Sequence, residues 1–174
     1  MSRTLFLYII AVLVPSIQVF GQSAIAVEIK TNINTIACEV ADTSITTSKG
    51  HLKKGFAITI PVEELGCPSG VTNDLIAHLN AKEYPNIKFI VCDIGYDTAI
   101  TSQPNLLQVD VQVADKLVTY AFNVTVVEKN NTDYLTGTLG LQLADFNIEP
   151  PTKMMGLVKV KDRIEIFFSL PMIS

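Results

Sequence analysis

Apolar and polar residues alternate with a period of two along most of the chain after Gly21, and this alternation constrains the fold more than any other feature. Successive side chains of a β-strand point to opposite faces of a sheet, so the alternation predicts strands with one apolar face. About eight strands are predicted in this way. They fall in the segments 24–32, 34–40, 55–62, 86–94, 106–128, 134–143 and 158–170, with hairpin turns predicted at 114–116 and 161–163.

One segment has helical spacing instead. Leu75, Ile76 and Leu79 recur at the spacing of one helix face, and Pro85 ends the element because proline does not continue a helix. A single short helix is therefore predicted over residues 71–82, between two strands.

Strands with one apolar face must bury that face and protect their edges, and closing the sheet into a barrel does both. The predicted fold class is therefore all-β with one short helix, arranged as a closed antiparallel eight-stranded β-barrel. A two-sheet sandwich is the competing architecture, and periodicity does not separate the two. An outer-membrane barrel is set aside because it needs aromatic girdles and a terminal aromatic residue, whereas this chain has 7% aromatic residues and ends "LPMIS".

Residues 1–21 have the layout of a secretory signal peptide. Arg3 lies in a short n-region, an apolar run extends from Leu5 to Val14, and small residues precede a predicted cleavage after Gly21. The apolar run is about half as long as the ~20 residues that a membrane-spanning helix needs. We therefore expect export to the periplasm or the exterior, with residues 22–174 forming one domain without a membrane span.

The charge balance of the exported chain is acidic. Removing the signal peptide takes Arg3 from the 13 basic residues, and against 17 acidic residues the net charge becomes −5. No basic cluster is larger than Lys53-Lys54. This balance argues against a nucleic-acid partner and against an anionic membrane as partner.

The sequence lacks the groupings that catalysis or metal binding requires. The two histidines, His51 and His78, fall in a loop and on the predicted helix, so we expect no metal site. Ser69 lies outside any Gly-x-Ser-x-Gly elbow, and no Gly-rich phosphate loop occurs. We therefore expect no catalytic residues, no cofactor and no enzyme activity. Thiol catalysis by Cys67 or Cys92 with His78 is the alternative that the residues leave open.

Three cysteines, Cys38, Cys67 and Cys92, would meet an oxidising compartment after export, where one disulfide can form. Three pairings are open. Cys92 lies within a predicted strand, whereas Cys38 lies near a strand end and Cys67 lies in a loop, where a bridge is easier to place. The sequence favours the pair Cys38–Cys67, with three thiols as the alternative.

Three features in a fixed order resemble the YceI-like family of exported lipid- or polyisoprenoid-binding proteins. "AKEYPNIKFIVCDI", residues 81–94, is similar to the family's helix followed by an aromatic-Pro-x-Ile/Thr-x-Phe strand, and residues 106–126 are similar to its central hairpin. "LADFNIEPP" and "GLVKVKDRIEIFFSL" are similar to its Asp-Phe-x-Ile segment and its closing hairpin. The resemblance covers residues 25–170. The turn at 114–116 departs from the family, because it lacks the glycines that often occur there.

The resemblance implies an antiparallel, lipocalin-like barrel whose interior holds an isoprenoid quinone, a polyisoprenoid or a lipid chain. It also supports the Cys38–Cys67 bridge, because one branch of the family has a cysteine in each of these segments. Such a ligand needs a mostly apolar cavity. The side chains expected to contact it are Phe56, Ile58, Leu75, Leu79, Phe89, Val91, Val109, Val111, Tyr120, Phe122, Leu139, Leu141, Phe146, Met154, Met155, Ile166 and Phe168.

The connection "EPPTKMMGL", residues 149–157, carries two prolines, which a paired central strand does not tolerate, and two methionines. In a closed barrel this connection would cross one end. We interpret it as a stiff lid edge at a cavity mouth, with Met154 and Met155 turned inward and Phe146 and Ile148 as anchors. The alternative function is an exported structural or interaction module with a filled barrel, whose loops bind another protein. The sequence leaves a homodimer open.

Overall fold

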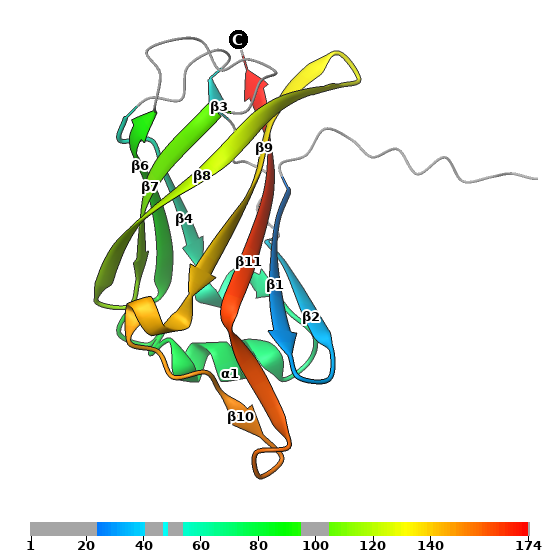
Figure 1. The fold of residues 1–174 in the computed structure, drawn as a ribbon, viewed down its shortest axis with the longest axis vertical. Helices are drawn as coiled ribbons and strands as arrows, with labels where there is room; N and C mark the ends of the chain where they lie inside the picture. Colours follow the sequence, from blue (N-terminus) through cyan, green and yellow to red (C-terminus); the bar gives the residue numbers. More distant parts are fainter. Residues whose placement is uncertain (1–23, 41–46, 49–53, 95–104, 174) are drawn as a thin grey trace, which may run out of the picture.

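The computed structural model describes residues 24–40, 47–48, 54–94 and 105–173, and the predicted signal peptide lies outside these ranges (Figure 1). The described residues form one sheet system, one α-helix and two short 3-10 turns. The long strands are β1 (Ala24–Thr31), β2 (Thr35–Val40), β4 (Ala57–Pro61), β6 (Asn86–Ile94), β7 (Asn105–Val113), β8 (Lys116–Lys129), β9 (Thr132–Gln142) and β11 (Val158–Ile173). Three strands have two residues each: β3 (Thr47–Ser48), β5 (Leu65–Gly66) and β10 (Thr152–Lys153).

The strands are ordered β4-β6-β7-β8-β9-β11-β1-β2-β5, and each is antiparallel to its neighbour. The sheet curls into a nearly closed barrel (Figure 1), because its two outermost strands, β4 and β5, are joined by the three-residue turn η1 (Val62–Glu64). The predicted all-β, lipocalin-like barrel is confirmed. A single continuous sheet excludes the two-sheet sandwich, and the short β5 makes a ninth strand beside the eight long ones.

A disulfide holds the seam of the barrel. Cys38 on β2 is bonded to Cys67, which follows β5 directly, with the two sulfur atoms 2.05 Å apart. The bond reinforces the short β2–β5 ladder, which has only two residue pairs. Cys92 lies on β6 and is not part of the bridge. The pairing predicted from the sequence is therefore present.

The last strand is continuous, so the predicted hairpin at 161–163 is wrong. β11 pairs with β1 on one side and with β9 on the other. Its register against β1 is interrupted between the pairs Ile29–Ile164 and Thr31–Val160. The polar residues 161–163 thus lie at a β-bulge, which bends a strand without reversing it. The predicted β7–β8 turn at 114–116 is confirmed.

Helix α1 (Val71–His78) lies across one end of the barrel (Figure 1) and ends four residues earlier than predicted. Asn80 has a φ of 49°, and the amide of Ala81 donates a hydrogen bond of 2.9 Å to the carbonyl of Ile76. The left-handed residue and the hydrogen bond to the carbonyl five residues earlier form a Schellman motif, which ends a helix. No helix among the described residues is both long and apolar enough to cross a membrane.

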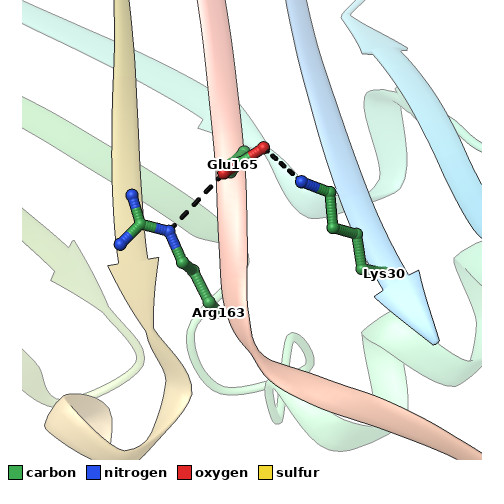
Figure 2. A network of polar contacts seen from close by, with 3 residues as sticks. All are labelled: Lys30, Arg163 and Glu165. Carbon is green, nitrogen blue, oxygen red and sulfur yellow. Dashed lines mark hydrogen bonds and ion pairs between the residues drawn. The ribbon is translucent and has the colours of Figure 1, made fainter. Parts of the chain in front are cut away.

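An ion-pair network joins β1 to β11 on the outer face of the barrel (Figure 2). Lys30 Nζ lies 2.7 Å from Glu165 Oε2, and Arg163 Nε lies 3.5 Å from Glu165 Oε1. The hydrogen bond from Lys30 is the main reason why the pKa of Glu165 is lowered. The carboxylate is therefore shared by two cations beside the bulge.

Candidate ligand-binding cavity

The barrel is hollow at the end that α1 covers. A cavity of about 580 Å³ lies there, bounded by α1, the strands β1, β2, β4 and β11, and the 3-10 turn η2 (Leu143–Phe146). This volume falls within the ~300–1,000 Å³ that is typical of small-molecule sites. The end of the barrel that α1 covers is thus large enough to hold a ligand.

Strand register explains why the walls of this cavity are apolar. Val27 on β1 pairs with Ile166 on β11, and Ile29 pairs with Ile164 on β11 and with Ile36 on β2. Side chains two residues apart on a strand point to the same face, so these cross-strand rows all face the interior. All five residues line the cavity.

A second cavity, of about 60 Å³, lies on the side away from α1, and every described residue that lines it is apolar. Phe122 and Phe168 meet there edge to face, with ring centroids 5.8 Å apart. Gly137 pairs with Phe168 across the β9–β11 ladder, and a Cβ atom at Gly137 would lie 2.6 Å from Cζ of Phe168. The missing side chain at residue 137 therefore leaves room for the ring.

Two side chains, Phe89 on β6 and Ile166 on β11, line both cavities. They form the partition between the large cavity and the small one. Phe89 is half-buried and borders both cavities. A larger hollow space would result if this ring were removed.

Polar side chains gather on one side of the large cavity's mouth. Ser69, Asn73, Asp74 and His78 come from α1 and the residues before it, and Lys153 comes from β10. Lys153 Nζ lies 2.5 Å from Asp74 Oδ1, so an ion pair joins α1 to the β10–β11 arm. Both side chains are largely exposed, and such pairs contribute only ~0–1 kcal/mol to stability.

Tyr120 fixes the turn η2 against β8. Its hydroxyl donates a hydrogen bond of 2.5 Å to Asp145 Oδ2, and its ring stacks on Phe146 with centroids 6.2 Å apart. Burial of the phenol, followed by the hydrogen bond to Asp145, raises the pKa of Tyr120 to about 12. These contacts hold Phe146 in the cavity wall, where it is 3% exposed.

Most of the side chains predicted to contact a ligand line one of the two cavities. They are Phe56, Ile58, Leu75, Leu79, Phe89, Val91, Val109, Phe122, Leu139, Leu141, Phe146, Ile166 and Phe168. Val111 lines neither cavity, although it is fully buried. Tyr120 lines neither, because it packs on η2. Contact of the others with a ligand stays a prediction.

Met154 and Met155 do not turn inward, so the predicted orientation of the lid edge is wrong. Met154 is 70% exposed and Met155 is fully exposed. The backbone is the reason: φ is 53° and 55° at the two methionines and 88° at Gly156, a left-handed turn that directs both side chains to solvent. Pro151 of the connection and the predicted anchor Ile148 line the large cavity.

Sequence reasoning missed part of the wall and all of the polar rim. Val27, Ile29 and Ile36 carry the period-two signal and could have been included on that ground. Asp74 and Lys153 are 79 residues apart, and no local pattern brings them together. Only the three-dimensional packing of β10 over α1 reveals this pair.

The cavity offers a mostly apolar surface for binding. Among the described residues, no group of three or more His, Cys, Asp or Glu is placed to hold a metal ion. The walls are apolar apart from the buried Thr31, and the exposed polar groups stand at the mouth. Such an arrangement can enclose an apolar chain and leave a polar end group at the rim.

No protein-family model and no curated protein matches the sequence. Solved structures do match. BcnA of Burkholderia cenocepacia superposes with a TM-score of 0.64 at 20% identity, over 84% of this chain and 94% of that one. A polyisoprenoid-binding domain of Saccharophagus degradans gives 0.60 at 10% identity, over 84% and 91%. The YceI protein of Campylobacter jejuni gives 0.56 at 14% identity, over 82% of each chain. The resemblance seen in the sequence is thus confirmed in three dimensions: the chain has the fold of the YceI-like proteins.

Proposed function

We propose that the protein binds an apolar isoprenoid or lipid chain inside the barrel and carries or sequesters it without covalent chemistry. One observation supports this proposal above all: a cavity of about 580 Å³ whose walls are apolar and whose polar groups stand at the mouth. A filled barrel would favour a purely structural or protein-binding module instead. The hollow end favours the binding function.

The physical chemistry of the walls fits a chain-shaped ligand. Each methylene that leaves water for an apolar cavity contributes about 0.8 kcal/mol, so a chain gains affinity with length until the space is full. The inner cavity lies behind Phe89 and Ile166, at the far end of the same interior. A linear or isoprenoid chain directed from the mouth toward this partition uses the interior better than a compact ligand does.

The rim provides the orientation. A polar head group at the mouth would meet Asn73, His78 and the Lys153–Asp74 pair. Buried polar groups without partners are costly, so a head group is expected to stay at this rim rather than enter the apolar walls. The chain therefore enters tail first.

Two further points support this assignment. One neighbour in fold, the domain from Saccharophagus degradans, is described as polyisoprenoid-binding. The signal-peptide pattern in residues 1–21 and the Cys38–Cys67 disulfide both fit an exported protein, with residues 22–174 as its single domain. Export and ligand class are parts of the proposal.

The decisive experiment is extraction of the purified, natively exported protein with organic solvent, followed by mass spectrometry. A stoichiometric isoprenoid or lipid is the expected result. If no such molecule is found and the protein takes up no added isoprenoid alcohol or fatty acid, the proposal is refuted.

A matched pair of variants tests the position of the ligand. Val27 lines the cavity, whereas Val127 is an outward-facing valine on β8 that is 49% exposed. Val27→Phe fills cavity space and is expected to exclude about two methylenes, which lowers the affinity for a fatty acid roughly tenfold. Val127→Phe makes the same change outside the barrel and should leave the affinity unchanged. Equal affinities of both variants would place the ligand elsewhere.

A further inference from the structure

We propose that the end of the molecule beside the cavity mouth docks on a lipid bilayer surface through two apolar turns. The β1–β2 turn carries Ile33, and the β10–β11 turn carries Met154, Met155 and Leu157. We call these four side chains the apolar tip. Figure 1 shows both turns at the end of the molecule where α1 lies. The use of docking for ligand exchange rests on the proposed function, but docking itself is measured without a ligand.

The tip is the most exposed apolar surface of the described residues. Ile33 is 68% exposed, Met154 70%, Met155 104% and Leu157 69%. The other exposed large apolar side chains lie on strands or turns along the barrel and are less exposed. Apolar side chains that gather at one exposed point of a protein commonly mark a contact with a partner or a membrane.

Hydrogen bonds hold the two turns side by side. The amide of Asn32 donates to the carbonyl of Lys159 (3.0 Å), and the amide of Lys159 donates to Asn32 Oδ1 (2.8 Å). Asn32 Nδ2 also donates to the carbonyl of Leu157 (2.9 Å). The four apolar side chains therefore belong to one surface rather than to two independent loops.

The backbone of the tip is held in a costly conformation that displays these side chains. Met154 and Met155 both have positive φ, a region that residues other than glycine seldom adopt. The turn is closed by hydrogen bonds from the amides of Gly156 and Leu157 to the carbonyls of Lys153 and Met154. Sparsely populated backbone conformations of this kind concentrate at functional sites. The turn keeps two methionines in solvent at the cost of local strain.

The charge next to the tip suits a membrane surface. Residues 150–161 contain three lysines and no acidic residue, but Lys153 is ion-paired with Asp74, so Lys159 and Lys161 provide the local positive charge. Val158 and Val160 line the cavity, so the alternating Lys159 and Lys161 face outward, and both are exposed. The predicted net charge of −5 argues against an anionic surface, but charges farther than about 8–10 Å are largely screened at physiological salt. The local lysines therefore dominate the contact, because interfacial binding combines buried apolar area with electrostatic attraction to anionic lipids.

The tip is continuous with the cavity mouth. Pro151 and Lys153 of the connection and Val158, the first residue of β11, line the large cavity. Insertion of the tip would therefore bring the mouth against the acyl region of the bilayer. A second copy of this chain is a poorer partner, because a stable interface buries about 800 Å² on each side and the tip consists of four side chains on two narrow turns.

Flotation with lipid vesicles tests the proposal. Vesicles of phosphatidylcholine with and without phosphatidylglycerol are mixed with ligand-free protein. Wild-type protein is expected to float with both kinds of vesicle, and more strongly with the anionic kind at low salt. The double variant Met154→Ser/Met155→Ser should bind both kinds of vesicle at least about tenfold more weakly. Burial of the two methionine side chains in the bilayer strengthens partitioning onto vesicles by more than about tenfold, and the variant loses this contribution.

Two controls complete the test. Leu106→Ser/Val127→Ser removes exposed apolar side chains from β7 and β8, away from the end that α1 covers, and should bind vesicles as the wild type does. Lys159→Gln/Lys161→Gln should weaken binding to the anionic vesicles only. All variants change exposed residues, and thermal unfolding confirms that each is folded.

The outcomes separate docking from ligand binding. Docking is overturned if wild-type protein binds no vesicles, if the methionine variant binds as well as the wild type, or if that variant dissociates a dimer detected by light scattering. Vesicle binding by a protein that never takes up a lipid supports docking and refutes the proposed function. Lipid uptake from detergent by a protein that binds no vesicles supports the proposed function and overturns docking.

Discussion

Replacing Phe89 with alanine should lengthen the chain that the barrel accepts. Phe89 and Ile166 separate the two cavities, so removal of the ring joins the inner space of about 60 Å³ to the outer space of about 580 Å³. The inner space alone holds about two water-sized groups, and the vacated ring adds to it. We expect room for about three more methylenes, which corresponds to ~2.4 kcal/mol or roughly 50-fold in affinity for long chains.

The cost of this substitution in stability is moderate. Phe→Ala in a solid core costs about 3–5 kcal/mol, but Phe89 is half-buried beside space that is already empty. We expect a loss nearer ~2 kcal/mol, which lowers the unfolding temperature of a chain of this length by roughly 4–8 °C. The variant should therefore fold well enough for binding to be measured.

Competition between an apolar fluorescent dye and a series of fatty acids of increasing length measures the effect. The wild type should reach its highest affinity at one length, and Phe89→Ala should shift that optimum to longer chains. Phe167→Ala is the matched control, because Phe167 alternates with the inward Ile166 and Phe168 and faces outward. An unchanged optimum in Phe89→Ala, or an equal shift in the control, would refute the partition.

Two further predictions concern the stability of the barrel. Cys38→Ser/Cys67→Ser should lower the free energy of unfolding by about 3–4 kcal/mol, because the bond closes a loop of 29 residues, whereas Cys92→Ser should leave the seam intact; a smaller loss in urea unfolding would contradict this. Tyr120 has its pKa raised from 10.0 to about 12, so its contribution is complete below about pH 10 and is lost as the pH rises to about 12. In Tyr120→Phe the loss of stability that Tyr120 causes between about pH 10 and about pH 12 should be absent. An unchanged dependence of the free energy of unfolding on pH would disprove this prediction.

The barrel could be predicted from the sequence because the alternation that specifies each strand lies within a short segment of the chain. Alternation in β7 and β8 fixes which side chains face inward, and the Ala114–Asp115 turn between them follows from the same pattern. The same alternation predicts that Phe56, Ile58 and Phe89 face the interior, and all three line a cavity. A period of two determines the face of a residue wherever one face is buried.

The size of the hollow space could not be predicted in this way. Val111 and Val109 have the same pattern on the same strand, yet Val109 lines a cavity and Val111 lines neither cavity. Likewise, the bulge at 161–163 and a turn have similar polar sequences, and only the pairing of β11 with both β1 and β9 distinguishes them.

The methionine pair shows how far an apolar residue in a connection can mislead. Methionine side chains are often buried, and the prolines before Met154 and Met155 favour a stiff edge over the cavity. Pro151 does line the mouth, and its carbonyl accepts a hydrogen bond of 3.0 Å from the amide of Val160. The chain then makes a left-handed turn over Met154, Met155 and Gly156, and both methionine side chains are exposed to solvent. Gly156 was visible in the sequence as a residue that permits positive φ, but two further positive values at Met154 and Met155 follow from no propensity. What the sequence could not reveal is therefore the feature on which membrane docking depends: a strained backbone that keeps apolar side chains out of the core.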